Sequence, residues 1–381
     1  MLNLRPEKYI GDFPLAKNYT YLDNACVTLK PKQVIDKINE YYTIYPGCGG
    51  RSSHSIGRKV TEEVENSRRI IEKTFKEKVV FTRNTTEGIN LIAKSYPFKK
   101  GDIVLLSNKE HNSNLVPWQE LRKKGVKLDF YEHGDLNDFK EKVEKASFVA
   151  TNQVSNLDGS IQEVEEMVRI TRKYNIKILI DGAQALPHKQ ADVRLADYYV
   201  ASGHKMLGPS GTGMLFAKEE NLDLLENYNV GGDTVKDTTF KEAEFESGIN
   251  RFEAGLQDYA GILGLGEAIK YLNNVGFKKI ERHENKLRKL AVEELQKLGG
   301  KIFSGSGGIV SFNFEGIDPH DLALQLNERD VMVRSGYHCC HSWFNEKGIK
   351  GSVRASFYFY NTEEDVKRLV EAVKQAVNIL K

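Results

Sequence analysis

Short apolar runs alternate with longer amphipathic stretches through the first two thirds of the chain. The runs predict strands at 79–82, 102–107, 148–151, 176–181, 198–202 and 213–217. Helical spacing between them predicts helices over 86–96 and 161–174, which are long enough for the crossover between parallel strands. This alternation predicts an α/β fold with a mostly parallel sheet covered by helices.

The last third of the chain has longer amphipathic helices. One predicted helix keeps four leucines on one face: Leu287, Leu290, Leu295 and Leu298. Another begins after Thr362, and Asp365 three residues later predicts a capping box. We expect a large domain over 16–257 and a smaller C-terminal α+β domain over 258–381, with residues 1–15 packing on the smaller domain.

Composition narrows the class of protein. The net charge of +2 and the lack of a basic stripe give no reason to expect a nucleic-acid partner. The first 18 residues carry scattered charges and no apolar core, so we expect neither a signal peptide nor a membrane partner, and the cytoplasm is the default location. None of the four cysteines forms a Cys-x-x-Cys pair, so a disulfide framework or a zinc site is not expected. Reactivity is the remaining reason for a cysteine to matter.

Lys205 directly follows the strand predicted at 198–202 and precedes a loop rich in glycine. It could be a surface lysine on a turn, which is the common case. It could also be a desolvated lysine whose amine attacks a carbonyl. Lys205 alone does not decide between these interpretations.

Polar residues also follow the other predicted strands, at the edge of the sheet where α/β proteins bind ligands. They are Thr85, Thr86, His111, Asn156, Asp181 and Gln184. The threonines stand at a helix start, where they could bind a phosphate or simply cap the helix. A carboxylate that ends an apolar strand, as Asp181 does, is costly unless a cation or donors meet it. Pyridoxal phosphate needs a lysine, a carboxylate and an anion site, so it is the cofactor that this set predicts.

The motifs that carry these residues resemble one family. "YLDNACVT", "FTRNTTEGINLIA", "EHNSNLVPWQ", "SNLDG", "DGAQA", "SGHKMLGPSGTG", "RFEAG", "RSGYHC" and "VRASFYFYNT" occur in the order found in group II cysteine desulfurases. This branch of the class V aminotransferases also holds selenocysteine lyases. The resemblance runs from about residue 20 to the C-terminus. It implies a fold-type I pyridoxal-phosphate-dependent transferase that forms a homodimer with its active sites at the subunit interface.

The resemblance also implies a role for each residue of the set. The residues implied to hold the cofactor are Thr85, Thr86, His111, Asn156, Asp181, Gln184, Ser202, His204 and Lys205. Lys205 binds the aldehyde, Asp181 pairs with the ring nitrogen and Gln184 bonds the phenolic oxygen. His111 stacks on the ring and handles the thiol proton, and the threonines, Ser202 and His204 hold the phosphate. Asn156 and Arg354 bind the substrate, with the arginine taking its carboxylate.

"RSGYHCCHSW" at 334–343 places two adjacent cysteines between two histidines. Their spacing differs from that of zinc ligands, so no metal is expected. A buried, inert cysteine remains possible, although the polar neighbours favour an accessible loop, and Arg334, His338 and His341 could favour a thiolate. The resemblance places the catalytic persulfide on Cys339. Cys340 stands where alanine is common, and it could be a resolving thiol or an apolar filler.

The implied activity is conversion of L-cysteine to L-alanine with an enzyme persulfide, which supplies sulfur to an acceptor protein for iron–sulfur cluster or thio-cofactor assembly. A selenocysteine lyase, a cysteine sulfinate desulfinase and a low-activity scaffold partner are the alternatives. The chain departs from the family pattern at three positions. Leu256 replaces a threonine that reaches the neighbouring subunit's phosphate, and Thr234 or Gln257 could compensate. Tyr337 and Gly50 each replace a histidine.

Overall fold

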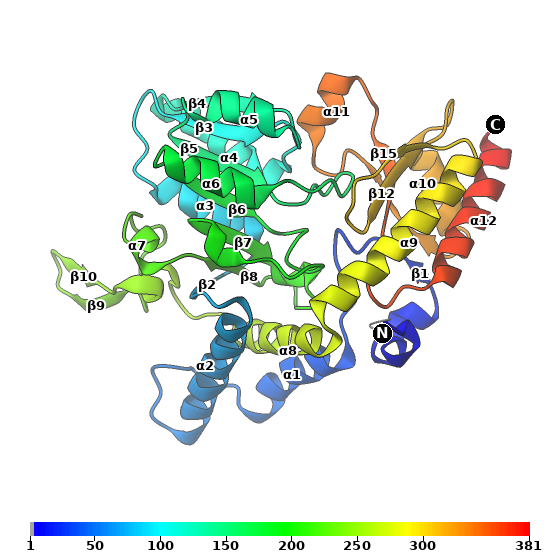
Figure 1. Cartoon of the computed structure of the whole chain (residues 1–381). Helices are drawn as coiled ribbons and strands as arrows, with labels where there is room; N and C mark the ends of the chain where they lie inside the picture. The colour runs from blue at the N-terminus through cyan, green and yellow to red at the C-terminus, as the bar shows by residue number, and fades with distance from the viewer. Residues whose placement is uncertain (1–3) are drawn as a thin grey trace.

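A seven-stranded sheet forms the centre of the larger part of the computed structural model, which describes residues 4–381 (Figure 1). In spatial order its strands are β2 (Val79–Thr82), β8 (Gly213–Phe216), β7 (Tyr198–Ser202), β6 (Lys177–Asp181), β5 (Phe148–Asn152), β3 (Ile103–Ser107) and β4 (Lys127–Tyr131). Strand β8 runs opposite to the other six strands of this sheet. The predicted α/β fold with a mostly parallel sheet is confirmed.

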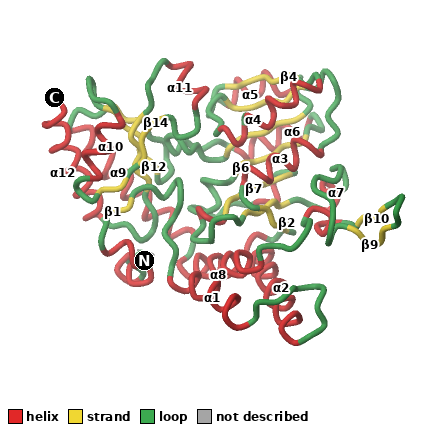
Figure 2. Tube along the Cα trace, turned by 180° about the vertical axis from the view of Figure 1, so that it is seen from behind, coloured by secondary structure: helices red, strands yellow, loops and turns green. Residues whose placement is uncertain are grey.

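Helices cover both faces of this sheet (Figure 2). The helices up to the end of the large sheet region are α1 (Lys32–Ile44), α2 (Ser55–Phe75), α3 (Thr85–Ser95), α4 (Val116–Glu120), α5 (Leu136–Val143), α6 (Val164–Lys173), α7 (Glu219–Leu222) and α8 (Tyr259–Val275). Neighbouring side chains of a strand point to opposite faces. In β6, Ile178 and Ile180 join a core with residues of α2, α6 and α8, whereas Leu179 joins a second core with residues of α3 and α4. Burial on both faces explains why the predicted strands read as unbroken apolar runs.

A smaller antiparallel sheet lies beside the large one. Its order is β11 (Lys301–Phe303), β12 (Ile309–Asn313), β15 (Ser352–Ser356) and β14 (Arg334–Gly336). It packs with α9 (Phe277–Lys297), α10 (Pro319–Asn327) and α12 (Glu363–Leu380), and α11 (His341–Lys347) follows β14. The predicted capping box of α12 is confirmed, because Thr362 Oγ1 accepts a hydrogen bond from the Asp365 amide and Asp365 Oδ2 accepts one from the Thr362 amide.

The expected domain boundary after residue 257 stays a prediction. Helix α8 packs against α1 and α2, and its apolar residues share a core with the large sheet. We therefore propose that the large domain extends through α8. Near the N-terminus, Phe13 packs against both Tyr271 of α8 and Phe359, so residues 4–15 contact both parts of the chain; residues 1–3 of this expectation lie outside the described residues.

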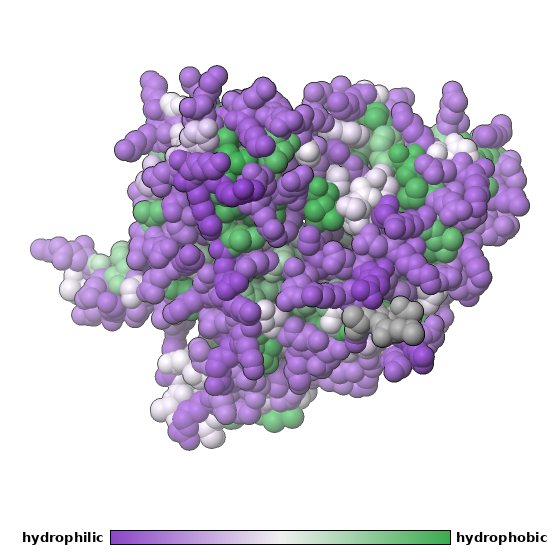
Figure 3. Space-filling view, viewed as in Figure 1, coloured by the Kyte–Doolittle hydropathy of each residue, from purple (hydrophilic) through white to green (hydrophobic). Residues whose placement is uncertain are grey.

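Two short pairings complete the topology. Strand β1 (Thr20–Tyr21) pairs in parallel with β13 (Val331–Met332), and β9 (Val235–Thr238) pairs with β10 (Ala243–Phe245) in a hairpin that projects from the body of the molecule (Figure 1). The face in Figure 3 is mostly hydrophilic, with scattered apolar residues. Over residues 4–381, none of the helices combines the length and the apolar character needed to cross a membrane.

Candidate active site

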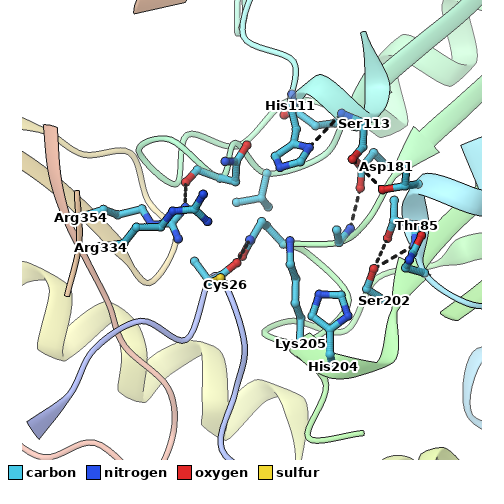
Figure 4. Close-up of a pocket in the computed structure, with 18 residues that line it drawn as sticks. Cys26, Thr85, His111, Ser113, Asp181, Ser202, His204, Lys205, Arg334 and Arg354 are labelled. Atoms are coloured by element: carbon cyan, nitrogen blue, oxygen red, sulfur yellow. Dashed lines mark hydrogen bonds between the residues drawn. The ribbon is translucent and has the colours of Figure 1, made fainter. Parts of the chain in front are cut away.

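The candidate active site is a cavity of about 200 Å³ at the carboxyl ends of β5, β6 and β7. These strands contribute Asn152, Asp181 and Ser202, and the smaller sheet contributes Arg334 and Arg354. Figure 4 shows the arginines on one side of the pocket and Asp181 and Ser202 on the other. The pocket therefore lies between the two sheets, at the strand ends where the sequence predicts a ligand site.

Lys205 enters this pocket from a single 3-10 turn that follows β7. Burial lowers the pKa of its amine, and the nearby Asp181 carboxylate opposes that effect. A lowered pKa increases the fraction of neutral amine, which is the form that attacks a carbonyl. The turn is tightly packed, because a Cβ at Gly203 would collide with Thr212. The loop of small residues after β7 thus permits the close packing that holds Lys205 in place.

Asp181 and Gln184 line the pocket wall next to Lys205. Asp181 Oδ1 accepts a hydrogen bond from the Ala183 amide at 2.9 Å. Burial raises the pKa of Asp181, with the Ala183 amide and the Lys205 charge acting in the opposite direction. Gln184 Nε2 donates to the carbonyl of Ala25 at 2.7 Å, and its Oε1 is buried without a hydrogen-bond partner within residues 4–381. Gln184 Oε1 and the Asp181 carboxylate can therefore still accept hydrogen bonds from a polar ligand.

The start of α3 lies on the same side of the pocket as Asp181 and Ser202 (Figure 4). Asn84 caps this helix by accepting a hydrogen bond from the Glu87 amide, so the alternative that the two threonines serve as the cap is wrong. Thr85 contacts the Ser202 hydroxyl through its amide at 2.9 Å and its own hydroxyl at 2.7 Å. Thr86 Oγ1 lies 2.7 Å from Ser113 Oγ. The helix start therefore presents a group of hydroxyls and amides suited to an anion.

Two histidines of the pocket are uncharged at neutral pH. Burial, followed by the positive charges of Lys205 and Arg334, lowers the pKa of His111 to about 3. Its Nδ1 accepts a hydrogen bond from the Ser113 amide at 3.0 Å, so the proton of the neutral ring resides on Nε2. Burial and Lys205 also lower the pKa of His204 to about 4. Both rings therefore offer neutral N–H donors and flat surfaces.

Arg354 is 1% exposed and joins the pocket to the cysteine loop. Its Nη1 donates to the carbonyl of Asn156 at 2.8 Å, its Nη2 lies 3.3 Å from Asp23 Oδ1, and its Nε has no partner within the described chain. The Asn156 side chain donates to the carbonyl of His338 at 2.6 Å and accepts from the thiol of Cys340 at 3.3 Å. In this structure the Asn156 amide thus holds the cysteine loop, and its expected role toward cofactor and substrate stays a prediction.

The two adjacent cysteines occupy different environments. Cys339 is half-buried, and Arg334 Nη2 lies 3.4 Å from its Sγ. Cys340 is fully buried, and burial raises the pKa of its thiol to about 12. Cys339 does not line the pocket itself, but the pocket-lining Arg334 connects the two. The arrangement favours Cys339 as the accessible thiol.

The charge expected around Cys339 comes from fewer groups than the sequence suggests. His338 is 1% exposed, its Nε2 lies 2.9 Å from Ser352 Oγ, and burial together with Arg354 holds its pKa well below the ordinary value. It is therefore uncharged, and the expectation that it favours a thiolate is wrong. His341 Nδ1 contacts the Asn112 side chain at 3.0 Å. Of the three expected cations, Arg334 is the one that contacts the Cys339 sulfur.

The pocket brings together every predicted cofactor residue and Arg354. It also contains residues to which the sequence interpretation gave no role at this site: Cys26, Asn84, Ser113 and Asn152. Cys26 stands within the motif "YLDNACVT", so its place beside the pocket could have been inferred from that motif. Leu256 does not line this pocket, and its side chain is 64% exposed. The Thr234 hydroxyl forms hydrogen bonds with the Gly231 backbone in its own turn.

Residues 20–369 match the aminotransferase class-V family, and the chain belongs to that family. A protein of Pyrococcus abyssi named "Probable cysteine desulfurase" is 37% identical over 99% of this chain and 98% of its own length. A cysteine desulfurase from Thermococcus onnurineus is 36% identical with a TM-score of 0.96, covering 99% of this chain and 100% of its own.

The cysteine desulfurase CsdA of Escherichia coli is 30% identical with a TM-score of 0.92, and the match covers 99% of both chains. These similarities confirm the predicted family and class of enzyme, a cysteine desulfurase of the class V aminotransferases. The family and the set of donors in the pocket both support pyridoxal phosphate as the cofactor.

Proposed function

We propose that the chain removes sulfur from L-cysteine, releasing L-alanine and leaving a persulfide on Cys339. The observation that carries the proposal is that Lys205, Asp181 and Arg354 share one pocket, while Arg334 of that pocket contacts Cys339. An amine with a lowered pKa, a buried carboxylate and a guanidinium suit an amino-acid substrate bound to an aldehyde cofactor. The accessible thiol supplies the sulfur acceptor.

The residues present fit pyridoxal phosphate. The buried Oε1 of Gln184 and Oδ1 of Asn152 lack partners within residues 4–381, and the Asp181 carboxylate, whose pKa burial raises, would be stabilised by a protonated ring nitrogen. Thr85, Thr86, Ser202 and His204 would hold the phosphate, Gln184 the phenolic oxygen, Lys205 the aldehyde and His111 one face of the ring. When bound, this cofactor stabilises negative charge that develops at the substrate Cα.

The side chains around the pocket bind the substrate, move its proton and accept its sulfur. Arg354 binds the substrate carboxylate, for which its unpartnered Nε and its planar shape are suited. Lys205 Nζ moves the proton of the substrate Cα. The Cys339 thiolate attacks the substrate sulfur while the carbon–sulfur bond breaks, and Arg334 stabilises the negative charge at that thiolate. The neutral His111 presents Nε2–H to the pocket, and its predicted role with the thiol proton is part of this proposal.

We further propose a homodimer, a protein acceptor for the persulfide sulfur, a role in iron–sulfur cluster or thio-cofactor assembly, and a cytoplasmic location. Apolar side chains that project into solvent support the homodimer: Leu256 is 64% exposed, and Phe240 stands fully exposed at the hairpin of β9 and β10. Burying such side chains in a subunit interface is energetically favourable. Light scattering during size-exclusion chromatography measures the mass and would contradict the homodimer by giving a monomer.

The enzyme assay uses the purified holoenzyme with L-cysteine, with and without a reductant, and measures alanine and sulfide. With the reductant, we expect equal amounts of alanine and sulfide. In the absence of the reductant, the first turnovers should release alanine but no free sulfide. Selenocysteine and cysteine sulfinate serve as competing substrates, and preference for either one would contradict the proposal. Cys339→Ser removes the persulfide and most L-cysteine activity, whereas Cys340→Ala stays within a few-fold of wild type, about 1 kcal/mol or less in barrier. Sulfur found on Cys340 instead would refute the assignment.

A further inference from the structure

Cys26 is a second thiol at the pocket, on a segment far in sequence from the cysteine loop. It lines the cavity together with Lys205, Arg334 and Arg354, and Figure 4 shows it between the arginines and Lys205. It is half-buried and forms no disulfide. A free thiol on the wall of a site that handles sulfur is chemically competent to take part in the reaction.

The backbone around Cys26 is held in place from both sides. The Ala25 carbonyl accepts a hydrogen bond from Gln184 Nε2 at 2.7 Å, and the Ala25 amide donates to Ser356 Oγ at 2.9 Å. Two residues after Cys26, the Thr28 amide donates to the carbonyl of His204 at 3.1 Å. These contacts tie the Cys26 segment to the cofactor-binding residues, so the position of its thiol beside the pocket is set by the site itself.

Arg334 contacts the thiol of Cys339 and lines the same pocket as Cys26. Its Nη2 lies 3.4 Å from Cys339 Sγ. Burial lowers the pKa of Arg334, but negative charge on Cys26, and then on Cys339, outweighs that effect and leaves the pKa raised. A guanidinium that contacts one sulfur and shares a pocket with the other can stabilise a thiolate at either one. The unpartnered, buried Nε of Arg354 adds further donor capacity on the same wall of the pocket.

We propose that Cys26 is a second sulfur carrier, which takes the sulfur from the persulfide of Cys339. This inference rests on the proposed function. The persulfide extends Cys339 by about 2 Å, and Cys26 attacks its outer sulfur. A sulfur–sulfur bond forms at Cys26 while the bond at Cys339 breaks, and the electron pair leaves on Cys339 Sγ as a thiolate. Because one persulfide replaces another, the step needs no oxidant or reductant, and Cys339 is free for a second turnover.

The test counts turnovers in the absence of reductant. Reduced holoenzyme is freed of reductant and mixed anaerobically with excess L-cysteine; alanine formed in the burst is measured, and added sulfur is located by alkylation and peptide mass spectrometry. Wild type is expected to carry sulfur on both Cys339 and Cys26 and to give a burst about twofold larger than Cys26→Ala. Cys48→Ala is the matched control, because Cys48 is also free and half-buried but does not line the pocket. Its burst should equal that of wild type.

The outcomes separate this inference from the proposed function. No alanine from wild type, or no sulfur on Cys339, contradicts the proposed function. Sulfur on Cys339 alone, with equal bursts for wild type and Cys26→Ala, overturns the inference and leaves the function standing. Sulfur on Cys26 in the Cys339→Ser variant also overturns the inference, because Cys26 then reacts with the substrate directly. Formation of a Cys26–Cys339 disulfide would overturn the inference as well. Cys26→Ser, which keeps the side-chain size, repeats the measurement, and cofactor absorbance verifies that both variants are loaded.

Discussion

Replacing Arg354 by lysine tests whether the shape of the guanidinium, and not only its charge, binds the substrate carboxylate. Arg354 uses Nη1 for the Asn156 carbonyl at 2.8 Å and Nη2 for Asp23 at 3.3 Å, which leaves Nε free. A lysine keeps the positive charge but cannot hold both neighbours and still present a flat pair of donors. One lost hydrogen bond to a charged group costs about 1.5 to 3 kcal/mol. That range corresponds to a KM for L-cysteine roughly 10 to 150 times higher.

Steady-state alanine formation over a range of L-cysteine concentrations measures this effect. Arg194→Lys is the matched control, because Arg194 makes a similar two-point contact with Asp192 at 2.8 and 2.7 Å, but on the surface. Its KM should not change. An Arg354→Lys variant with KM within twofold of wild type, or with a lower kcat at unchanged KM, would refute carboxylate binding as the role of Arg354. Arg354→Ala with added guanidinium ions provides a second test, since recovered activity requires a folded protein.

The remaining predictions concern the pocket and stability. Lys205→Ala should lose turnover and the visible absorbance of the lysine-bound cofactor, and persistence of that absorbance would disprove the assignment. Asp181→Asn should fold normally but lose more than about tenfold in activity, because a neutral partner no longer favours a protonated ring nitrogen. Burial lowers the pKa of His133 to about 4, so the unfolded chain binds its proton more tightly. The stability that the neutral ring contributes is present above about pH 6.5 and is lost as the pH falls, so the free energy of unfolding should drop by about 2 kcal/mol between pH 7 and 5. Urea unfolding at both pH values should show a smaller drop for His133→Asn. Thr362→Ala should cost about 1 kcal/mol of unfolding free energy by removing the cap of α12.

Strands made of unbroken apolar runs could be predicted from the sequence, whereas the charged edge strand β4 could not. The predicted runs at 79–82 and 198–202 coincide with β2 and β7, because all positions of these strands except the last are apolar or aromatic and enter one of the two cores. Strand β4 was not predicted. It pairs only with β3 at the edge of the sheet and contains Lys127 and Asp129, so its composition resembles that of a loop.

The site could be predicted where a residue's role depends on the strand that carries it. Asp181 ends a buried strand and Lys205 follows another, and parallel strands bring their carboxyl ends to one edge of the sheet. The states of His338 and Asn156 could not be predicted in this way. Both are decided by contacts with distant segments, Ser352 for His338 and the cysteine loop for Asn156, which no local pattern encodes.

The backbone of the cysteine loop shows the same dependence on distant contacts. The Cys340 amide donates to the Tyr337 carbonyl at 2.8 Å, and the two residues between them, His338 and Cys339, have φ angles of 48° and 60°. Residues other than glycine adopt this left-handed region at a cost of about 1 to 2 kcal/mol each. Buried contacts on both sides hold the turn: His338 to Ser352, Cys340 to Asn156, and the Cys339 carbonyl to the Asn112 amide at 2.7 Å. The neighbours of Cys339 are thus fixed in the protein interior while its own sulfur stays half-exposed against Arg334, so the strained turn sets the direction in which the thiol can meet a substrate.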